Sequence, residues 1–285
     1  MTSGNQGYES IDPSRAERLV LDGAVRVLDV RTPAEFTSLG HIPGALLLPV
    51  DLVPSGAATL PRDDRPLLVT CEHGVRSAHA ADFLARAGFE GVLNMAGGMS
   101  QWRGPRDHSP GSLYAEAGPS SWLVECAGLL PPGGSALDVA CGRGRHALLL
   151  AAASFPVRAL DRDEEAIREL AAIASRLGLP VTAEVIDLEV PGVELGHEEH
   201  DLIVVFRYLH RPLFPALIRA LRPGGLLLYE TFTRGQAARG GPSNPDYLLA
   251  ESELPALVAP LEILRRREGE FDGRMVSAIA ARKPA

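Results

Sequence analysis

The sequence predicts an α/β fold divided into two domains. Apolar runs of strand length alternate with amphipathic segments from Val25 to Ile279, a pattern that favours α/β architecture over a helix bundle or a β-sandwich. The chain has 285 residues, of which 46% are hydrophobic, so it is large enough to bury two cores. Residues 103–121 are rich in Pro, Gly and Ser and interrupt the periodic pattern. We therefore place the first domain at residues 1–108, a linker at 109–120 and the second domain at 121–285.

The first domain is predicted to be a small α/β domain with one long helix after its third strand. We expect strands at Val25–Val30, Leu46–Leu48, Pro66–Cys71 and Val92–Asn94, and a helix at Arg76–Ala87.

The second domain is predicted to be a seven-stranded, Rossmann-like sheet. Helical segments separate its first five strands, so right-handed crossovers make that part parallel and doubly wound. The last two strands are joined by the polar stretch "EGEFDG". We expect a helix around Ser121–Leu130 and strands at Ala136–Ala140, Val157–Asp161, Val181–Asp187, Asp201–Phe206, Leu226–Thr231, Leu261–Arg267 and Arg274–Arg282.

Composition narrows the partners and the location. The net charge of -8 leaves no basic footprint, which disfavours nucleic acid as a partner. The three cysteines are not in metal-ligand spacing, so we expect no metal site and a reducing, cytoplasmic location. The N-terminus does not resemble a secretory signal and no segment reaches the length of a membrane span, so no membrane is expected. The oligomeric state is not indicated.

Cys71 is the first candidate for chemistry. It ends a buried strand, Gly74 lies in the turn that follows, and a helix starts near Arg76. Backbone N–H groups converge on the sulfur in such a turn, and together with the helix N-terminus they favour a thiolate over a thiol. Arg76 adds a fixed positive charge. This loop is therefore suited to a sulfur nucleophile with an anionic substrate group, or to a persulfide.

Three ordered motifs in the first domain resemble a single-domain rhodanese: "VLDVRTPAEFTSLGHIPGALLLP", "CEHGVRS" and "NMAGGMSQW". The resemblance implies that Cys71 accepts a sulfane sulfur as a persulfide and passes it to a nucleophile. It also implies scaffold roles for Asp29 and Arg31 and a turn at His41. The site residues it implies are Cys71 and Arg76 for catalysis, with Glu72, His73, Gly74, Val75 and Ser77 forming the sulfur loop.

The length and charge of this loop narrow the chemistry. Four residues separate Cys71 from Arg76, whereas phosphatases and arsenate reductases with related loops place five there. Glu72 adds a carboxylate that is expected to repel a dianion such as thiosulfate and to raise the cost of a thiolate. The donor is therefore expected to be a protein or low-molecular-weight persulfide, with thiosulfate a poorer one. The alternative is that Cys71 is a buried structural thiol.

The stretch "LDVACGRGRHALLLA", residues 137–151, predicts a strand, a glycine turn and a helix. Gly142 and Gly144 let a ligand approach the backbone. The pattern also fits a dinucleotide fingerprint, with Asp161 about twenty residues on. Asp138 favours another cofactor, because a carboxylate four residues before the glycines suits the ammonium of a methionine moiety better than a pyrophosphate. We therefore expect S-adenosyl-L-methionine.

The motifs "LDVACGRGRHALLLA", "VRALDRDEEAI", "VIDLE", "HDLIVVFRYLHRPLF" and "LRPGGLLLYETF" resemble, in order, those of class I S-adenosylmethionine-dependent methyltransferases. The resemblance places the glycine turn at the methionine end of the cofactor, Asp161 at the ribose, and Asp187 with Leu188 at the adenine. The implied cofactor residues are Asp138, Ala140, Gly142, Gly144, Arg145, Asp161, Arg162, Asp187 and Leu188.

Within that class, "FRYLHRPLFPAL" and "YETFT" are similar to the tellurite-resistance type, whose substrates are soft chalcogen anions or thiols. This similarity implies substrate residues at the ends of the fourth and fifth strands. They are Arg207, Tyr208, His210, Arg211 and Tyr229. An Arg- and His-rich pocket suits an anionic acceptor. For His210 and Arg211 the alternatives are a solvated turn residue and the start of a helix. Cys141 is expected in the turn and Cys126 in helix packing.

The pairing of domains predicts a sulfur-handling enzyme with small-molecule substrates. A rhodanese half would form a persulfide on Cys71, and a methyltransferase half would methylate sulfide, a thiol or another chalcogen anion. Two alternatives stay open. The acceptor is an unrelated metabolite or a thiolated nucleic acid, with the rhodanese half as sulfur donor, or the rhodanese half senses persulfides and regulates the methyltransferase.

Overall fold

The computed structural model describes residues 7–57, 60–61, 64–109 and 119–285. The chain divides into two compact units. The first runs to Pro119 and also includes Ala172–Leu179, and the second consists of Ser120–Ala171 and Pro180–Ala285. The predicted linker, residues 109–120, lies mostly outside the described residues. In the described ranges, no helix combines the length and the apolar character needed to cross a membrane.

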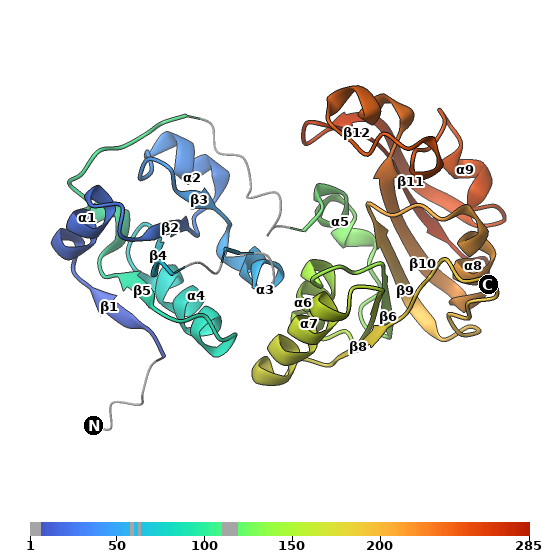
Figure 1. The fold of residues 1–285 in the computed structure, drawn as a ribbon, viewed down its shortest axis with the longest axis horizontal. Coiled ribbons are helices and arrows are strands. Elements are labelled where there is room, and N and C mark those ends of the chain that lie inside the picture. Colours follow the sequence, from blue (N-terminus) through green and yellow to red (C-terminus); the bar gives the residue numbers. More distant parts are fainter. Residues whose placement is uncertain (1–6, 58–59, 62–63, 110–118) are drawn as a thin grey trace. The chain divides into compact units, whose positions relative to one another are not determined.

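The first unit is built on a parallel sheet in the strand order β1-β5-β4-β2-β3, five strands among the residues described (Figure 1). Its strands are β1 (Glu9–Ile11), β2 (Arg26–Asp29), β3 (Leu46–Leu47), β4 (Leu67–Thr70) and β5 (Val92–Met95), and its helices are α1 (Pro13–Leu21), α2 (Pro33–Ser38), α3 (Val53–Gly56) and α4 (Val75–Arg86). Strands β2 to β5 and helix α4 confirm the predicted elements to within a residue at each end. Because β4 lies in the middle of the sheet, Cys71 stands at the centre of its carboxyl edge.

The helices and strands described in this unit include four that the sequence does not predict. They are β1, α1, α2 and the single-turn helix α3, and their short lengths explain the weak periodic signal. Local caps start α1 and α2. Asp12 accepts the backbone N–H of Arg15 at 2.9 Å, and Thr32 with Glu35 forms a reciprocal capping box. The α2 cap also fixes Glu35 near the sulfur loop.

The second unit carries a sheet in the order β11-β12-β10-β9-β6-β7-β8, seven strands within the described chain, of which β10, β9, β6, β7 and β8 run parallel. The strands are β6 (Ala136–Val139), β7 (Val157–Asp161), β8 (Val181–Val185), β9 (His200–Phe206), β10 (Leu221–Phe232), β11 (Glu262–Phe271) and β12 (Arg274–Arg282). The helices are α5 (Ser121–Glu125), α6 (Arg145–Ala152), α7 (Glu164–Leu177), α8 (Phe214–Ala220) and α9 (Leu254–Leu257). This is the predicted Rossmann-like sheet with an antiparallel hairpin.

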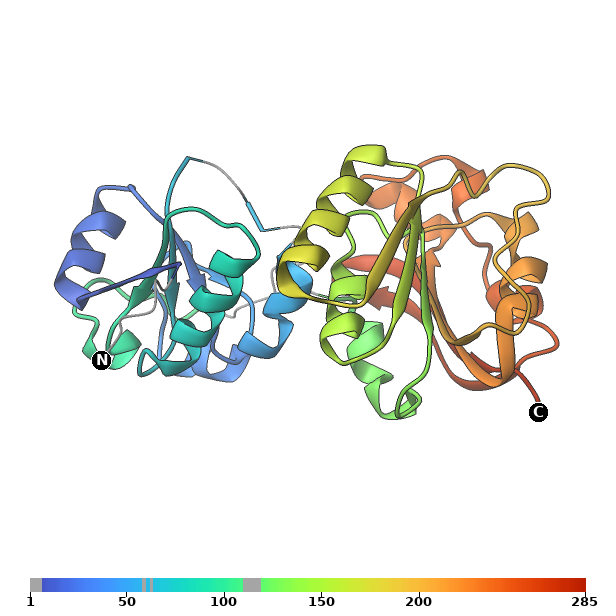
Figure 2. The ribbon, with the colours of Figure 1, turned by 90° about the horizontal axis from the view of Figure 1, so that it is seen from below.

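Helices cover both faces of this sheet. Figures 1 and 2 show α6 and α7 on one face and α8 and α9 on the other. Strand order reverses between β6 and β9, and ligands of open α/β sheets bind outside the carboxyl ends of the strands at such a point.

Four boundaries differ from the prediction by two residues or more. α5 ends at Glu125, before the predicted Leu130, and β11 continues to Phe271, beyond the predicted Arg267. β8 ends at Val185, before the predicted Asp187, and β10 starts at Leu221 because the register shifts at the turn before Leu226.

Candidate active sites

The sulfur of Cys71 is held by donors from the turn that starts α4. The backbone N–H of Gly74 donates to Cys71 Sγ at 3.1 Å, and Ser77 Oγ lies 3.3 Å from the same sulfur. The residue is 1% exposed. Burial raises the pKa of the Cys71 thiol, but the hydrogen bonds from Ser77 and from the backbone of the loop outweigh burial, so the pKa lies below its usual value. The loop therefore favours a thiolate at Cys71.

Gly74 is required by space as well as by conformation. Its φ of 86° is left-handed, and a Cβ there would lie 2.8 Å from the backbone nitrogen of Gly97. The 3₁₀ helix η2 (Gly98–Gln101) braces the loop from the other side, since Met99 N donates to Cys71 O at 2.8 Å and Ser100 N donates to Glu72 O at 2.9 Å. The predicted closing motif thus holds the sulfur loop in place.

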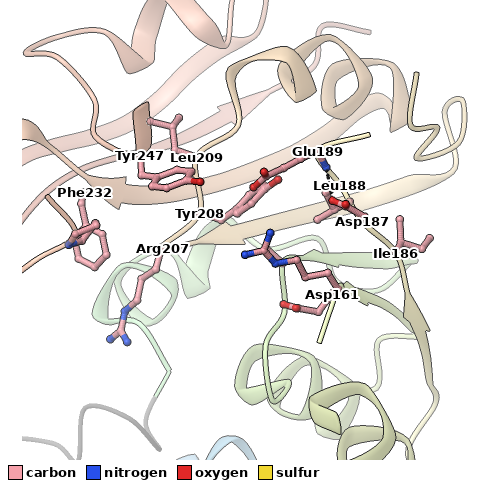
Figure 3. Close-up of a pocket in the computed structure, with 13 residues that line it drawn as sticks. Asp161, Ile186, Asp187, Leu188, Glu189, Arg207, Tyr208, Leu209, Phe232 and Tyr247 are labelled. Carbon is pink, nitrogen blue, oxygen red and sulfur yellow. Dashed lines mark hydrogen bonds between the residues drawn. The ribbon is translucent and has the colours of Figure 1, made fainter. Parts of the chain in front are cut away.

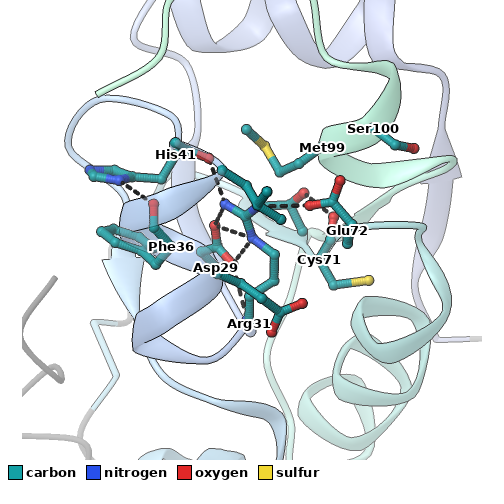
Figure 4. A network of polar contacts seen from close by, with 12 residues as sticks. Asp29, Arg31, Phe36, His41, Cys71, Glu72, Met99 and Ser100 are labelled. Atoms are coloured by element: carbon teal, nitrogen blue, oxygen red, sulfur yellow. Dashed lines mark hydrogen bonds and ion pairs between the residues drawn. The ribbon is translucent and has the colours of Figure 1, made fainter. Parts of the chain in front are cut away.

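Two arginines beside the loop are each paired with carboxylates. Buried Arg31 binds Asp29 with its Nε and Nη2 and donates from Nη1 to Glu72 at 2.8 Å, as Figure 4 shows. Arg76 donates to Glu35 at 2.5 and 2.9 Å. That ion pair lowers the pKa of the Glu35 carboxyl to about 2. The charges around the sulfur are therefore largely neutralised inside the protein.

This pairing changes the expected role of Glu72. Its carboxylate faces Arg31, and in Figure 4 the sulfur of Cys71 points to the other side. Glu72 thus acts on the sulfur less directly than its position in the sequence suggests, and its main contact is with the scaffold. His73 is exposed, with Nδ1 3.4 Å from Ser100 Oγ, and Val75 is 62% exposed at the start of α4. His41 stacks on Phe36 in the predicted turn.

In the second unit the glycine turn leads from β6 into α6. Three residues of the turn, Ala140, Gly142 and Gly144, have positive φ angles of 56°, 54° and 76°. Asp161 fixes the turn by accepting the Gly142 N–H at 2.7 Å. The two glycines serve different purposes. A Cβ on Gly144 would collide with Leu170 of α7, whereas a Cβ on Gly142 would meet nothing within 4 Å. Gly144 therefore permits helix packing, and Gly142 leaves its backbone open.

Asp138 lies under this turn, and its buried carboxylate is only partly hydrogen-bonded within the described residues. It is 1% exposed, and among the described residues its Oδ2 has no hydrogen-bond partner. Burial raises the pKa of Asp138 to about 7, and the Ala147 N–H and the charge of Arg145 oppose that rise. An acceptor left in this state is complementary to a cationic ligand group.

A cavity of about 390 Å³ opens at the carboxyl ends of β6 to β9 (Figure 3). Of the predicted residues, seven line it: Ala140, Asp161, Arg162, Asp187, Leu188, Arg207 and Tyr208. The hydroxyl of Tyr208 is buried there with no hydrogen-bond partner in the described chain, and burial raises its pKa. Figure 3 shows Arg207 extending away from the end of the cavity marked by Ile186 and Leu188. The cavity thus brings together Asp161 from the end of β7 with Asp187 and Glu189 from beyond β8.

Three of the predicted substrate residues lie elsewhere. Arg211 forms a two-point ion pair with Glu253, at 2.6 and 3.0 Å, and pins a distant segment of chain. Tyr229 is 1% exposed and donates its hydroxyl to the Tyr208 carbonyl at 2.7 Å, which makes it part of the core. His210 lines a separate hollow beside Pro212. Their place in the sequence near strand ends does not bring them to the cavity.

The burial of His146, and of the two cysteines other than Cys71, reflects packing. His146 is 3% exposed, and its Nε2 accepts the Ser120 N–H at 3.1 Å. Burial, with Arg145 adding to it, holds the pKa of His146 well below its usual value, so it stays neutral. Burial also raises the pKa of Cys126 and Cys141, which therefore remain thiols.

Sequence reasoning missed several residues at both sites. Glu35 and Asn94 approach the sulfur loop from α2 and β5, and only the helix-capping pattern around Glu35 hinted at a fixed position. The far wall of the cavity comes from segments without a motif. Its additional lining residues are Ile186, Glu189, Leu209, Phe232, Pro242 and Tyr247. Within the described ranges, no group of three or more His, Cys, Asp or Glu side chains is arranged to hold a metal ion.

Comparison with known proteins assigns the first unit. Residues 12–105 match the rhodanese-like domain family. A sulfurtransferase from Allochromatium vinosum is 39% identical over 89 residues, which are 31% of this chain and 81% of that protein. The thiosulfate sulfurtransferase GlpE of Ectopseudomonas mendocina is 38% identical over 107 residues, covering 37% of this chain and 95% of its own length. The chain belongs to the rhodanese family. It is an enzyme of the sulfurtransferase class in this unit.

The second unit of this rhodanese matches a methyltransferase fold. Residues 114–228 match the tellurite resistance protein TehB family. The crystal structure of TehB from Haemophilus influenzae has a TM-score of 0.51 at 22% identity, and the match covers 60% of this chain. It spans 64% of that chain, less than two thirds of its length. The protein is therefore a rhodanese fused to a domain with the fold of S-adenosylmethionine-dependent methyltransferases.

The raised pKa of Asp138 predicts a pH-dependent stability penalty. Below pH 4 the carboxyl is protonated in both states, but between pH 4 and about 7 the unfolded chain ionises first, so stability falls as pH rises. Asp138→Asn removes this loss. Without cofactor, we expect the variant to be more stable than the parent by roughly 2 kcal/mol at pH 8 and equally stable at pH 4, measured by urea unfolding. A variant that is less stable at pH 8 would show that Asp138 has a partner when ionised.

Proposed function

We propose that this enzyme takes a sulfane sulfur onto Cys71 as a persulfide, and that its second domain transfers a methyl group from S-adenosyl-L-methionine to a small sulfur acceptor. The observation that carries the first step is the pair of donors, Gly74 N–H and Ser77 O–H, directed at Cys71 Sγ. Donors of this kind stabilise a thiolate, and the thiolate is the attacking form of cysteine.

The sulfur step balances without an oxidant or reductant. Cys71 thiolate attacks the sulfane sulfur of the donor and forms a new S–S bond, while the bond between that sulfur and the donor breaks. The electron pair of the broken bond leaves with the donor, as sulfite from thiosulfate or as a thiolate from a persulfide. A nucleophilic acceptor then attacks the outer sulfur of Cys71 persulfide and releases Cys71 thiolate.

The charges around Cys71 support a persulfide as the preferred donor. Arg31 is occupied by Asp29 and Glu72, and Arg76 is occupied by Glu35. A dianion such as thiosulfate must compete with these internal carboxylates, whereas a persulfide bears less charge. The names of the GlpE relatives favour thiosulfate instead. A comparison of kcat/KM for the two donors distinguishes these possibilities.

The residues of the second domain fit S-adenosyl-L-methionine. The unpartnered Oδ2 of Asp138 suits a cationic group at the glycine turn, and the open backbone of Gly142 admits a ligand. Asp161 and Asp187 line the cavity, where they would accept hydrogen bonds from the ribose and the adenine, and Leu188 would contact the base. Bound there, the cofactor supplies an electrophilic methyl group on a sulfonium.

A thiol, hydrosulfide or other soft chalcogen anion is the acceptor that the domain pairing favours. Such a nucleophile is already anionic or nearly so at neutral pH, so the protein has only to position it and exclude water. Among the predicted substrate residues, Arg207 and Tyr208 line the cavity and would bind an anion and orient it. The match to the tellurite resistance family supports a soft acceptor. The two steps would join without an oxidant or reductant if the acceptor of sulfur is a thiol: sulfur passed from Cys71 makes a persulfide, and methyl transfer to its terminal sulfur gives a methyl disulfide.

The donor preference is measured with the whole chain. We expect kcat/KM for glutathione persulfide to exceed that for thiosulfate by at least tenfold, because the reacting group of thiosulfate carries two negative charges into a neutralised site and that of a persulfide carries at most one. Sulfite or glutathione release is followed at several salt concentrations. Equal or better use of thiosulfate would assign this domain to the donor class of the GlpE relatives.

Cys71→Ser separates a catalytic from a sensing role of the rhodanese domain. We expect the variant to lose sulfur transfer by more than a thousandfold while it methylates an added thiol at the parent rate. The control is Cys126→Ser, which changes a buried thiol in the other domain. A parent enzyme whose methylation rate responds to persulfide, combined with a variant that does not respond, would instead make Cys71 a sensor.

The methyl acceptor is identified by mass. Purified enzyme with S-adenosyl-L-methionine is offered sulfide, glutathione persulfide, small thiols, selenite, tellurite and tRNA, and the methylated product is identified by mass spectrometry. We expect a methylated sulfur or selenium product, and loss of at least tenfold in cofactor affinity for Asp138→Asn. Methylation of tRNA alone, or of none of the sulfur, selenium and tellurium compounds, would refute the proposed acceptor class.

A further inference from the structure

Behind Cys71, three polar side chains from different elements are connected in a row by hydrogen bonds. Ser77 Oγ of α4 lies 3.3 Å from Cys71 Sγ and 2.7 Å from Asn94 Oδ1 of β5. Asn94 Nδ2 lies 3.1 Å from Ser10 Oγ of β1. Ser77 is 0% exposed and Asn94 is 4% exposed, whereas Ser10 is on the surface. This row of hydrogen bonds therefore runs from the Cys71 sulfur to solvent through the interior of the rhodanese domain.

Ser77 has one hydroxyl proton and two neighbours that can accept it. It cannot donate to Cys71 Sγ and to Asn94 Oδ1 at once. When Cys71 is a thiol, its S–H donates to Ser77 Oγ, Ser77 donates to Asn94 Oδ1, and Asn94 Nδ2 donates to Ser10. Every group in this arrangement is satisfied, and no donor is directed at the sulfur from Ser77.

A thiolate requires the opposite arrangement. Cys71 then needs a donor, so Ser77 turns its proton to the sulfur, and Asn94 Oδ1 loses the donor it had. A half-turn of the Asn94 amide restores the balance, because its NH₂ then donates to Ser77 Oγ and its oxygen accepts from the Ser10 hydroxyl. The two ends of an amide have nearly the same shape, so the half-turn leaves the packing unchanged. Asparagine offers a donor end and an acceptor end without a change of its own charge.

We propose that Ser77, Asn94 and Ser10 form a reversible hydrogen-bond chain whose direction inverts when Cys71 loses its proton, which makes Asn94 a positioning residue for the sulfur nucleophile. The proposal deepens the sulfur chemistry proposed above. Its test measures the thiol itself, so the outcome does not depend on whether sulfur transfer occurs.

Other charged groups near Cys71 stay constant in the test. They are Arg76 on α4 with its partner Glu35 on α2, Glu72 and His73 on the loop, and Asp29 with Arg31 at the end of β2. None of them belongs to the hydrogen-bond chain of Ser77, Asn94 and Ser10, and the variants below leave all of them in place.

Asn94→Asp locks the chain in one direction. An ionised carboxylate only accepts, so it holds the Ser77 proton away from the sulfur. We expect the midpoint of the pH profile of iodoacetamide alkylation, read at Cys71 by mass spectrometry, to rise by at least one pH unit. In the S77A background, N94D acts through charge alone, and we expect less than half of that rise. The matched control is Asn244→Asp in the other domain, which should leave the midpoint unchanged.

Equal shifts for N94D in the two backgrounds, or no shift, would overturn the proposal. A second measurement uses the parent protein and does not depend on how any variant folds. The chain has three asparagines, Asn5, Asn94 and Asn244. With ¹⁵N-asparagine labelling, one pair of side-chain NH₂ signals should titrate with the midpoint of Cys71. If no side-chain NH₂ signal follows the Cys71 midpoint, the direction of the hydrogen-bond chain does not invert.

Discussion

Both domains depend on the same constraint, which is that a parallel strand must end in a turn tight enough to start a helix across the sheet. Gly74 and Gly144 stand at these two turns, with φ angles of 86° and 76°, and each immediately precedes a helix. A turn of this kind leaves backbone N–H groups without helical partners. The chemistry of each domain follows from what those N–H groups and the side chains beside them contact.

The two turns solve that problem in different ways. In the rhodanese domain the Gly74 N–H contacts Cys71 Sγ, a nucleophile that the same chain provides. The surrounding charges are paired internally, through Arg31 with Glu72 and Arg76 with Glu35, so each of these charged side chains already has a partner of opposite charge within the protein. In the second domain the Gly142 N–H contacts Asp161, and Asp138 remains buried without a partner for Oδ2. That site is complementary to a ligand.

This difference fits the function proposed above, in which the first domain forms a persulfide and the second transfers a methyl group. A persulfide has to be made and released at a site that is ready before the donor arrives, so the groups that stabilise the sulfur anion are covalently part of the fold. Methyl transfer depends instead on a bound donor, and Asp138 bears an energetic cost until a cation is present. Residues that bind ligands often lower the stability of the fold, and the binding role proposed for Asp138 would account for its cost.

The sequence by itself determined the two α/β domains, most strand positions and the two glycine turns, because these depend on local periodicity and on residues close together in the chain. It also predicted Cys71, Asp138 and Asp161 as site residues, because they belong to motifs that are local in the chain. Tertiary structure decided which charges meet. Arg31 and Glu72 are 41 residues apart in the chain, as are Glu35 and Arg76, and Asn94 reaches Ser10 across 84 residues. Only the strand order of each sheet, which sequence periodicity does not encode, brings such distant side chains together.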